Sequence, residues 1–322
     1  STVLERYVVA VLYYSTDGPN WSRQDLNFLS DLPVCEWNNE VPSNRDGTLG
    51  IFCQETSTIR RVGFYDLGLT GTIPWELSLL VDLQGLNLGA NTLTGSLPTE
   101  FGDLKSLDFL QVALNSLTGT IPTELQQLTL LTHLDISDNK FVGTIPTELQ
   151  QLNILTYLYV SGNELIGTIT SGIGRMTGLI ELQLYNNSLT GSLPTELGLL
   201  NALTLLGLND NMLTGTLPTE LGQILTLQYV YTYNNQLEGT LPTELVKCTD
   251  LIRLSLYDNA FSGTIPTELG LMTALQGLYL HVNTLSGKSS FMWVTRATAW
   301  ALFTDSGLHS TTQELCPPNW AK

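Results

Sequence analysis

The sequence repeats one seven-residue segment at a fixed interval. The segment GTIPTEL stands at residues 119–125, 143–149 and 263–269, and close variants occupy most of the other 24-residue steps between residues 71 and 245. Laid out at this period without insertions, residues 59–287 form ten units, which begin at Ile59, Leu83, Leu107, Leu131, Leu155, Leu179, Leu203, Leu227, Leu251 and Leu275. A catalytic motif is needed only once, so repetition on this scale indicates architecture.

Each unit follows the pattern LxxLxLxxNxLxGxIPxxLxxLxx, and we number its positions 1 to 24 and the units coils 1 to 10. Apolar residues at positions 1, 4 and 6, such as Leu131, Leu134 and Ile136, are typical of a short strand whose inward side chains enter a shared core. Gly at position 13 permits an unusual backbone angle, and Pro at position 16 ends strand pairing. The sequence therefore predicts a right-handed solenoid of ten coils with a continuous parallel sheet on its concave side.

Position 9 is an asparagine column that Leu67 replaces in coil 1. Its members are Asn91, Asn115, Asn139, Asn163, Asn187, Asn211, Asn235, Asn259 and Asn283. A buried amide can satisfy backbone groups that a tight turn leaves unpaired. We therefore expect these side chains to point inward.

The LxGxIP half of the unit resembles the plant-type leucine-rich repeat. The opening LYYSTDGPNWSRQDLNFLSDLPVCEWNN, followed by GIFC, resembles the N-terminal cap of plant and diatom extracellular leucine-rich-repeat proteins. The resemblance implies an α/β solenoid, a second short sheet beside the concave one, and ligand recognition outside the cell. We expect an N-terminal cap over residues 1–58, repeats over 59–287 and a C-terminal cap over 288–322, all in one continuous domain.

The chain has four cysteines. In the caps that the opening resembles, the pair equivalent to Cys35 and Cys53 forms a disulfide, so we expect that bridge here. Cys248 stands at position 22, where most coils have leucine, so it is expected either as a buried apolar residue or as a partner of Cys316. Since no CxxC motif occurs, a zinc site is not expected.

Charge and hydropathy limit the partners. The chain carries 13 Lys plus Arg and 30 Asp plus Glu, a net charge of −17, which disfavours nucleic acid and anionic membranes. No apolar run is long enough to cross a bilayer, so we expect no membrane insertion by this chain. Sequons at Asn20 and Asn186 favour an extracellular glycoprotein.

Catalytic patterns are weak. His133, Asp135 and Ser137 contain the residue types of a hydrolase triad, but alternate positions of one strand lie about 6.6 Å apart, too far for a proton relay. The segment GIGRMTG from Gly172 lacks the spacing of a dinucleotide loop. It is read as an irregularity on the outer side, where coil 5 has lost its Pro and Glu. We expect no enzyme activity and no cofactor.

Positions 3, 5, 7 and 8 point outward from the predicted sheet and are free to vary. In coils 5 to 10 they gather eight of the twelve tyrosines, with two aspartates, one arginine and one histidine among them. The predicted ligand-binding residues are Tyr157, Tyr159, Tyr185, Tyr229, Tyr231, Tyr233, Tyr257, Tyr279, His281, Asp210, Asp258 and Arg253. Tyrosine supplies a large rigid contact area with a polar tip, although aromatic residues also suit strands for structural reasons.

Three functions fit this pattern. The leading hypothesis is a recognition domain that binds a protein or peptide on its concave face, as in a receptor ectodomain, a signalling protein or a secreted inhibitor. The first alternative is an adhesive cell-wall protein that binds polysaccharide through its tyrosines. The second alternative, ice binding, is suggested by threonine columns at positions 14 and 17, but the glutamate column at position 18 argues against a flat ice-binding face.

Overall fold

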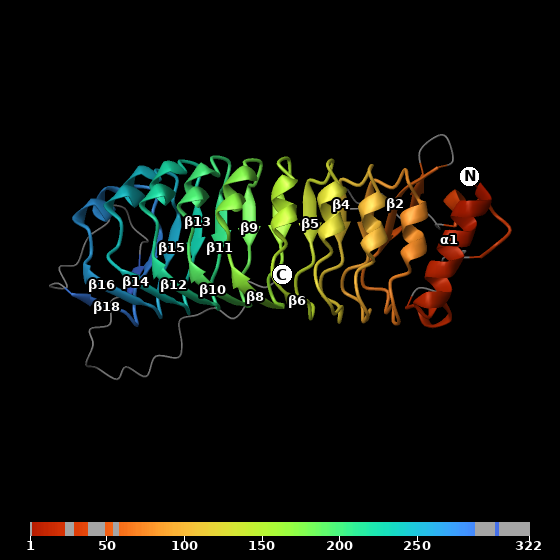
Figure 1. The fold of residues 1–322 in the computed structure, drawn as a ribbon, viewed down its shortest axis with the longest axis horizontal. Coiled ribbons are helices and arrows are strands. Elements are labelled where there is room, and N and C mark those ends of the chain that lie inside the picture. The colour runs from red at the N-terminus through yellow and green to blue at the C-terminus, as the bar shows by residue number, and fades with distance from the viewer. Residues whose placement is uncertain (1, 23–28, 38–48, 54–57, 287–299, 303–322) are drawn as a thin grey trace.

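The computed structural model describes residues 2–22, 29–37, 49–53, 58–286 and 300–302. Successive coils stack side by side into one elongated solenoid (Figure 1). A twelve-stranded sheet lines the concave side, a seven-stranded sheet runs beside it, and a row of short 3-10 helices covers the outer side. The predicted solenoid with a parallel concave sheet is confirmed.

Each coil supplies one strand to the concave sheet, and most supply one to the second sheet. The concave sheet contains β1 (Leu49–Cys53), β2 (Ile59–Phe64), β3 (Gly85–Asn87), β4 (Phe109–Gln111), β5 (His133–Asp135), β7 (Tyr157–Tyr159), β9 (Glu181–Gln183), β11 (Leu205–Gly207), β13 (Tyr229–Tyr231), β15 (Arg253–Ser255), β17 (Gly277–Tyr279) and β19 (Trp300–Leu302). The second sheet contains β6 (Val142–Gly143), β8 (Glu164–Thr168), β10 (Ser188–Ser192), β12 (Met212–Thr216), β14 (Gln236–Gly239), β16 (Ala260–Thr264) and β18 (Thr284–Ser286).

The helices comprise one α-helix in the cap and short 3-10 helices elsewhere. They are α1 (Thr2–Ser15), η1 (Gly18–Asn20), η2 (Val34–Glu36), η3 (Trp75–Leu79), η4 (Thr99–Asp103), η5 (Thr123–Gln127), η6 (Thr147–Gln151), η7 (Ser171–Arg175), η8 (Thr195–Leu199), η9 (Thr219–Gln223), η10 (Thr243–Lys247) and η11 (Thr267–Leu271). In most coils the TEL segment begins the 3-10 helix, and the proline of position 16 directly before it has extended backbone.

The N-terminal cap closes the open end of the core. Helix α1 lies across this end of the stack (Figure 1) and buries Val8, Val9 and Leu12. The predicted disulfide is confirmed, with the Cα atoms of Cys35 and Cys53 5.7 Å apart. Strand β1 pairs antiparallel with β2, whereas the strands from β2 onward pair in parallel. The cap therefore protects both the apolar core and the sheet edge.

The apolar positions form one continuous core. Leu131, Leu134 and Ile136 are fully buried, as are most of their counterparts in the other coils. Burying one such side chain contributes about 1.5 to 3 kcal/mol, so the coils stabilise one another through their shared interior.

The asparagine column points inward, as predicted, and Asn163 shows how it works. Its Oδ1 accepts a hydrogen bond of 3.0 Å from the backbone N–H of Phe141 in the preceding coil. Its Nδ2 donates to the carbonyl oxygens of Ile136, Val160 and Ser161 at 3.1 Å. One amide thus satisfies four backbone groups and links two coils.

Position 8 has left-handed backbone in every coil, with φ between 50° and 64°. The backbone N–H at this position donates to the next coil, as Asp258 does to the carbonyl of His281 at 3.0 Å. Asp, Asn or Gly usually occupies the position, since these residues tolerate positive φ best. Ala90, Leu114 and the β-branched Val282 are the exceptions.

Glycine at position 20 lets neighbouring 3-10 helices approach closely. A Cβ at Gly102, Gly174, Gly198 or Gly222 would lie under 3.0 Å from the backbone of the glutamate at position 18 in the next coil. Gln126, Gln150 and Val246 occupy this position in coils 3, 4 and 8, and the helices that follow them pack less closely. One column therefore controls the spacing on the outer side.

The concave sheet continues beyond the tenth coil. Strand β19 pairs in parallel with β17, where Gly277 pairs with Trp300, one residue short of the 24-residue step. The segment predicted as a C-terminal cap thus adds a strand to the sheet. The remainder of that predicted cap lies outside the described residues.

Candidate functional site

Aromatic rings on the concave face of coils 8 to 10 form two stacks. Tyr229 and Tyr231 stack along β13, with ring centroids 6.3 Å apart and planes inclined by 17°. Tyr233, Tyr257 and His281 stack across three coils, with successive centroids 4.5 and 4.4 Å apart and planes within 8° of parallel. Because position 7 recurs at strand spacing, flat side chains placed there meet face to face. We call these five residues, with Arg253 and Tyr279, the C-terminal aromatic surface.

Arg253 lies between the tyrosines of this surface. Its guanidinium carbon is 5.9 Å from the centroid of the Tyr279 ring, within cation–π range. Burial raises the pKa of the Tyr231 hydroxyl, and the charge of Arg253 and a hydrogen bond to it oppose that rise. Gly277 leaves room for this arrangement, because a Cβ there would lie 2.9 Å from the Tyr279 ring. The predicted cation is therefore engaged within the surface.

His281 ends the second stack. Burial lowers the pKa of its imidazole, and the carboxylate of Asp258 opposes that shift. Its Nδ1 is buried without a hydrogen-bond partner among the described residues. The neutral imidazole is therefore favoured at neutral pH, and it presents a ring face to Tyr257.

A second aromatic group covers coils 3 to 5. Phe109 stacks on His133 at 4.5 Å, and His133 contacts the rings of Tyr157 and Tyr159 at 5.3 and 5.5 Å. The Tyr159 hydroxyl donates a 2.7 Å hydrogen bond to Glu181, and burial with this carboxylate raises the pKa of that hydroxyl. Phe109 and Glu181 were missed from the sequence. Their signal was present, since both occupy the outward position 3.

Coil 7 separates the two aromatic groups. Its outward positions carry Leu205, Gly207 and Asn209, and Tyr185 of coil 6 lies against Gly207, 3.5 Å from where a Cβ would be. Gly207 pairs with Tyr231 in the sheet, as expected. The predicted tyrosine cluster is therefore two groups, and Tyr185 of coil 6 lies between them.

The polar residues predicted for the site have different environments. Asp210 accepts hydrogen bonds from Asn234 at 2.6 Å and Asn209 at 2.7 Å, which fix its carboxylate. Asp258 is exposed beside His281. Both sequon asparagines are also exposed, and Asn20 donates to the carboxylate of Asp17 at 3.0 Å. Glycosylation at Asn20 and Asn186 stays a prediction.

The triad-like residues do not form a relay. The Ser137 hydroxyl donates directly to Asp135 at 2.6 Å, and Gln111 donates to the other oxygen of that carboxylate at 3.1 Å. His133 is instead part of the aromatic group described above. Among the described residues, no group of His, Cys, Asp and Glu could hold a metal ion.

Cys248 is fully buried and forms no disulfide with any cysteine that the structure describes. The thiol donates to the carbonyl oxygen of Leu221 at 3.3 Å, and burial raises its pKa to about 11. Cys316 lies outside the described residues, so the pairing of these two cysteines stays a prediction.

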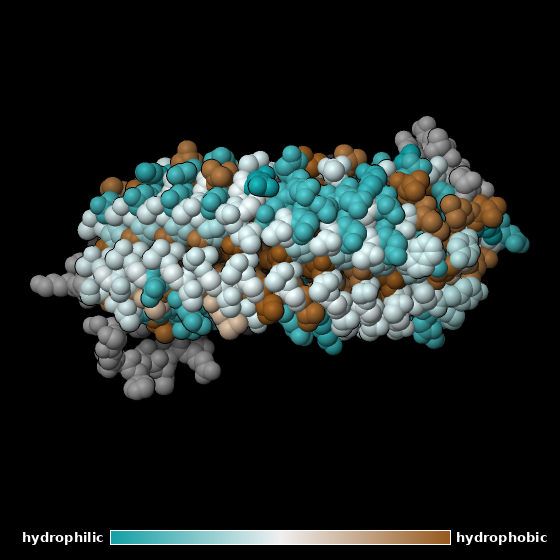
Figure 2. All heavy atoms as spheres, viewed as in Figure 1, coloured by the Kyte–Doolittle hydropathy of each residue, from teal (hydrophilic) through white to brown (hydrophobic). Residues whose placement is uncertain are grey.

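The second sheet and the isolated bridges that precede it along the stack present a band of hydroxyl side chains. Its register is staggered, so that position 14 of one coil pairs with position 12 of the next, as Thr168 does with Thr190. In Figure 2 the residues along the lower side of the molecule, where Figure 1 labels the strands of the second sheet, are mostly pale, the colour of weakly polar residues. We call the following residues the threonine band: Thr72, Thr94, Ser96, Thr118, Thr120, Thr144, Thr168, Thr190, Ser192, Thr214, Thr216, Thr240, Ser262, Thr264 and Ser286. Val142, Ile166 and Glu238 interrupt it.

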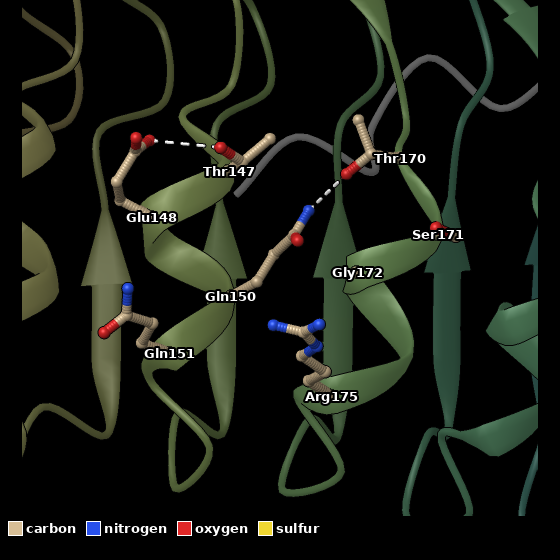
Figure 3. A pocket seen from close by; sticks show the side chains of 8 residues that line it. All are labelled: Thr147, Glu148, Gln150, Gln151, Thr170, Ser171, Gly172 and Arg175. Atoms are coloured by element: carbon tan, nitrogen blue, oxygen red, sulfur yellow. Dashed lines mark hydrogen bonds between the residues drawn. The ribbon is translucent and has the colours of Figure 1, made fainter.

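A hollow of about 380 Å³ opens on the outer side between η6 and η7 (Figure 3). Its lining residues are Thr147, Glu148, Gln150, Gln151, Thr170, Ser171, Gly172 and Arg175, and we call it the outer hollow. It lies at the irregularity noted in coil 5, which was not predicted as a site. Figure 2 shows hydrophilic residues gathered over this central part of the outer face.

Comparison with known proteins supports the fold. The family described as Leucine Rich Repeat matches residues 82–104, 130–152 and 178–200. No curated relative matches the chain. A plant peptide hormone receptor, RGFR1 in complex with RGF2, is 31% identical over 68% of this chain and 39% of its own, with a TM-score of 0.65. The leucine-rich-repeat ectodomain of the Arabidopsis receptor kinase HAESA, in complex with an IDA peptide hormone ligand, is 29% identical over 88% of this chain and 50% of its own, with a TM-score of 0.68.

A plant ice-binding protein is similar over nearly its whole length. It is 28% identical over 88% of this chain and 95% of its own, with a TM-score of 0.66. The two receptor structures are longer, since this chain spans only 39% and 50% of them. No helix in the described part of this chain is long and apolar enough to cross a membrane. The repeats, the two sheets and these neighbours together show that the chain is a leucine-rich-repeat solenoid.

Proposed function

We propose that the chain is a non-enzymatic extracellular recognition domain that binds a protein or peptide ligand on its concave face, at the C-terminal aromatic surface. The observation that carries the proposal is the pair of ring stacks in coils 8 to 10. Stacked rings form a rigid surface that loses little conformational entropy on binding, and their hydroxyls can hydrogen-bond to a ligand. The similarity to receptors whose solved complexes contain peptide hormones supports this assignment.

The charges around the surface favour a ligand with basic groups. Glu181, Asp210 and Asp258 lie at outward positions of coils 6 to 9, and Arg253 is already engaged with two tyrosines. A net negative face attracts cationic side chains and speeds their association. Apolar and aromatic ligand groups would pack on the rings, while lysine or arginine would approach the carboxylates.

The extracellular assignment rests on the cap disulfide and on the two glycosylation sequons. The Cys35–Cys53 disulfide favours an oxidising compartment, and both sequon asparagines are exposed. The similar receptor ectodomain supports the same location for this chain.

An unbiased interaction screen tests this proposal. Extracellular proteins, basic peptides and cell-wall glycans are presented to wild type and to the Tyr231→Ala/Tyr233→Ala variant. A matched control, Tyr7→Ala/Tyr14→Ala, removes two exposed tyrosines from α1 instead. We expect the concave variant to weaken binding at least about tenfold, since anchor residues often contribute 2 kcal/mol or more. Partners that bind all three proteins equally would reject the concave site.

Ice binding is a second candidate, favoured by the threonine band and by the similar plant ice-binding protein. The structure places the glutamate column on the 3-10 helices rather than on the second sheet. Several hydroxyls in the band are held in place, such as Thr94, which donates to the Gly71 carbonyl at 2.9 Å. A regular, nearly uncharged array of fixed hydroxyls can order water.

Thermal hysteresis and ice recrystallisation measurements test the second candidate. The Thr190→Lys/Thr214→Lys variant places two charges in the band, whereas Tyr231→Ala/Tyr233→Ala leaves the band intact. We expect the first variant to lose any activity that wild type shows and the second to keep it. Absence of hysteresis and of crystal shaping in wild type would remove this candidate.

A further inference from the structure

The outer hollow arises where three departures from the repeat pattern meet. In coil 5, Thr170 replaces the usual proline of position 16 and Gly172 replaces the usual glutamate of position 18. Across the gap, Gln150 of coil 4 stands at position 20, where most coils have glycine. Because Gln150 widens the gap and Gly172 leaves it unfilled, the hollow is specific to this pair of coils.

Gln150 forms the floor of the hollow. Figure 3 shows its side chain reaching from η6 to Thr170, and its Nε2 donates to the Thr170 hydroxyl. Its Oε1 lies against Gly172, where a Cβ would overlap with it. Beneath it, Gln150 and Thr170 also border a small apolar pocket with Leu149 and Ile173. The amide therefore separates a polar hollow from the apolar core.

Arg175 reverses the local charge of the outer ridge. Position 18 carries glutamate in the first four coils and again in coils 6 to 9, so coil 5 is the break in that column. Arg175 lies one helical turn after Gly172, the residue that interrupts this column. In Figure 3 its side chain points from η7 into the gap. It has no hydrogen bond or ion pair with any residue that the structure describes. With Glu148 on the opposite wall, the lining carries one charge of each sign.

The lining combines donors and acceptors in a way that selects its ligand. Arg175 only donates hydrogen bonds, the Glu148 carboxylate only accepts them, and the amides and hydroxyls do both. A ligand that matches this set carries many groups that can each donate and accept, and it has no net charge. We infer that the outer hollow binds a neutral polyhydroxylated ligand, either a free sugar or a sugar residue of a glycan.

Other ligand classes fit the hollow less well. An anion would be attracted to Arg175 but repelled by Glu148, which also lines the hollow. No aromatic side chain lines the hollow, so it lacks the anchors typical of a peptide interface. The hollow lies on the outer side, whereas the aromatic surface lies on the concave sheet. The inference is therefore independent of the proposed function.

Calorimetric titration at millimolar ligand tests this site. Glucose, galactose, mannose and xylose represent free sugars, cellohexaose and xylohexaose represent glycan chains, and sodium acetate and glycine represent an anion and a zwitterion. Arg175→Gln removes the unpaired cation at an exposed position, and Lys247→Gln is the matched control at position 21 of coil 8. Gly172→Glu restores the repeat pattern and fills the hollow.

We expect wild type and Lys247→Gln to bind at least one sugar equally, Arg175→Gln to bind it at least tenfold more weakly, and Gly172→Glu not to bind it. Tighter binding of hexaoses than of monosaccharides would identify a glycan chain as the source of the ligand. Tyr231→Ala/Tyr233→Ala should bind sugar like wild type. The inference is overturned if wild type binds no sugar, if acetate or glycine binds more tightly than every sugar, or if Arg175→Gln binds like wild type with an unchanged thermal midpoint.

Discussion

The imidazole of His281 stacks on the ring of Tyr257, with centroids 4.4 Å apart and planes inclined by 8°. This contact ends a column of rings that begins at Tyr233. Stacking of this kind contributes about 0.5 to 1.5 kcal/mol beyond the area it buries. It also removes the imidazole from water, which is why the pKa of His281 is lowered.

This shift predicts a pH dependence of stability. Above the unfolded-state pKa of about 6.5, His281 is neutral in both states and its contribution is fully present. As the pH falls, the unfolded chain binds a proton first, so stability is lost until the folded pKa is passed. Urea unfolding at pH 8 and pH 5 should show a larger loss for wild type than for His281→Phe. An equal loss in both proteins would contradict the lowered pKa.

The inward asparagine column predicts that removing one of its amide side chains lowers the stability of the fold. Asn163→Ala leaves four buried backbone groups without their partner, which should lower the free energy of unfolding by about 1 to 3 kcal/mol. Asn153→Ala, at an exposed position ten residues earlier, is the control and should have little effect. Chemical denaturation measures both, and similar stabilities for the two variants would mean that the ladder is not needed.

The left-handed backbone at position 8 predicts a stabilising substitution. Val282 adopts φ 53°, which is unfavourable for a β-branched side chain, and Asn234 adopts φ 51° at the same position of coil 8. Val282→Asn should raise the free energy of unfolding by about 1 kcal/mol, and Asn234→Val should lower it by at least as much. A destabilised Val282→Asn would show that contacts of the exposed valine outweigh its backbone strain.

The cap disulfide predicts sensitivity to reduction. The Cys35→Ala/Cys53→Ala variant should lose about 2 to 5 kcal/mol of stability. Reductant should lower the thermal midpoint of wild type toward that of the variant and leave the variant unchanged. In this comparison both the otherwise wild-type protein and the variant also carry Cys248→Ala, so that Cys248 and Cys316 cannot contribute a second reducible bridge. A wild-type midpoint that is insensitive to reductant would show that the bridge does not limit stability.

The 24-residue period made the fold predictable, because every coil repeats the same pattern of inward and outward positions. The inward column of Asn163 and the register that places Gly207 beside Tyr231 follow directly from a 24-residue step. The 3-10 form of the outer helices and the left-handed turn at position 8 are backbone choices that hydrophobic pattern does not specify.

The candidate sites were harder to predict, because they depend on contacts between coils. Phe109 joins the second aromatic group, in coils 3 to 5, through its contact with His133 in the neighbouring coil. The outer hollow depends on Gln150 and Gly172, which are 22 residues apart and belong to different coils. Each change is an isolated exception in the sequence, and only the stacked structure brings the two together.

The packing of the outer helices at position 20 predicts how strongly the stack curves. Hydrogen bonds hold the concave side at strand spacing, about 4.8 Å, so the outer side supplies the adjustable length. Where glycine lets the outer helices come close together, we expect the stack to run straighter, and where Gln126, Gln150 or Val246 keeps them apart, we expect it to bend more. The residue at position 20 of each coil would thus set the local curvature of the stack. Exchanging Gln126 and Gln150 for glycine would unbend the middle of the molecule and change the span that a ligand must bridge.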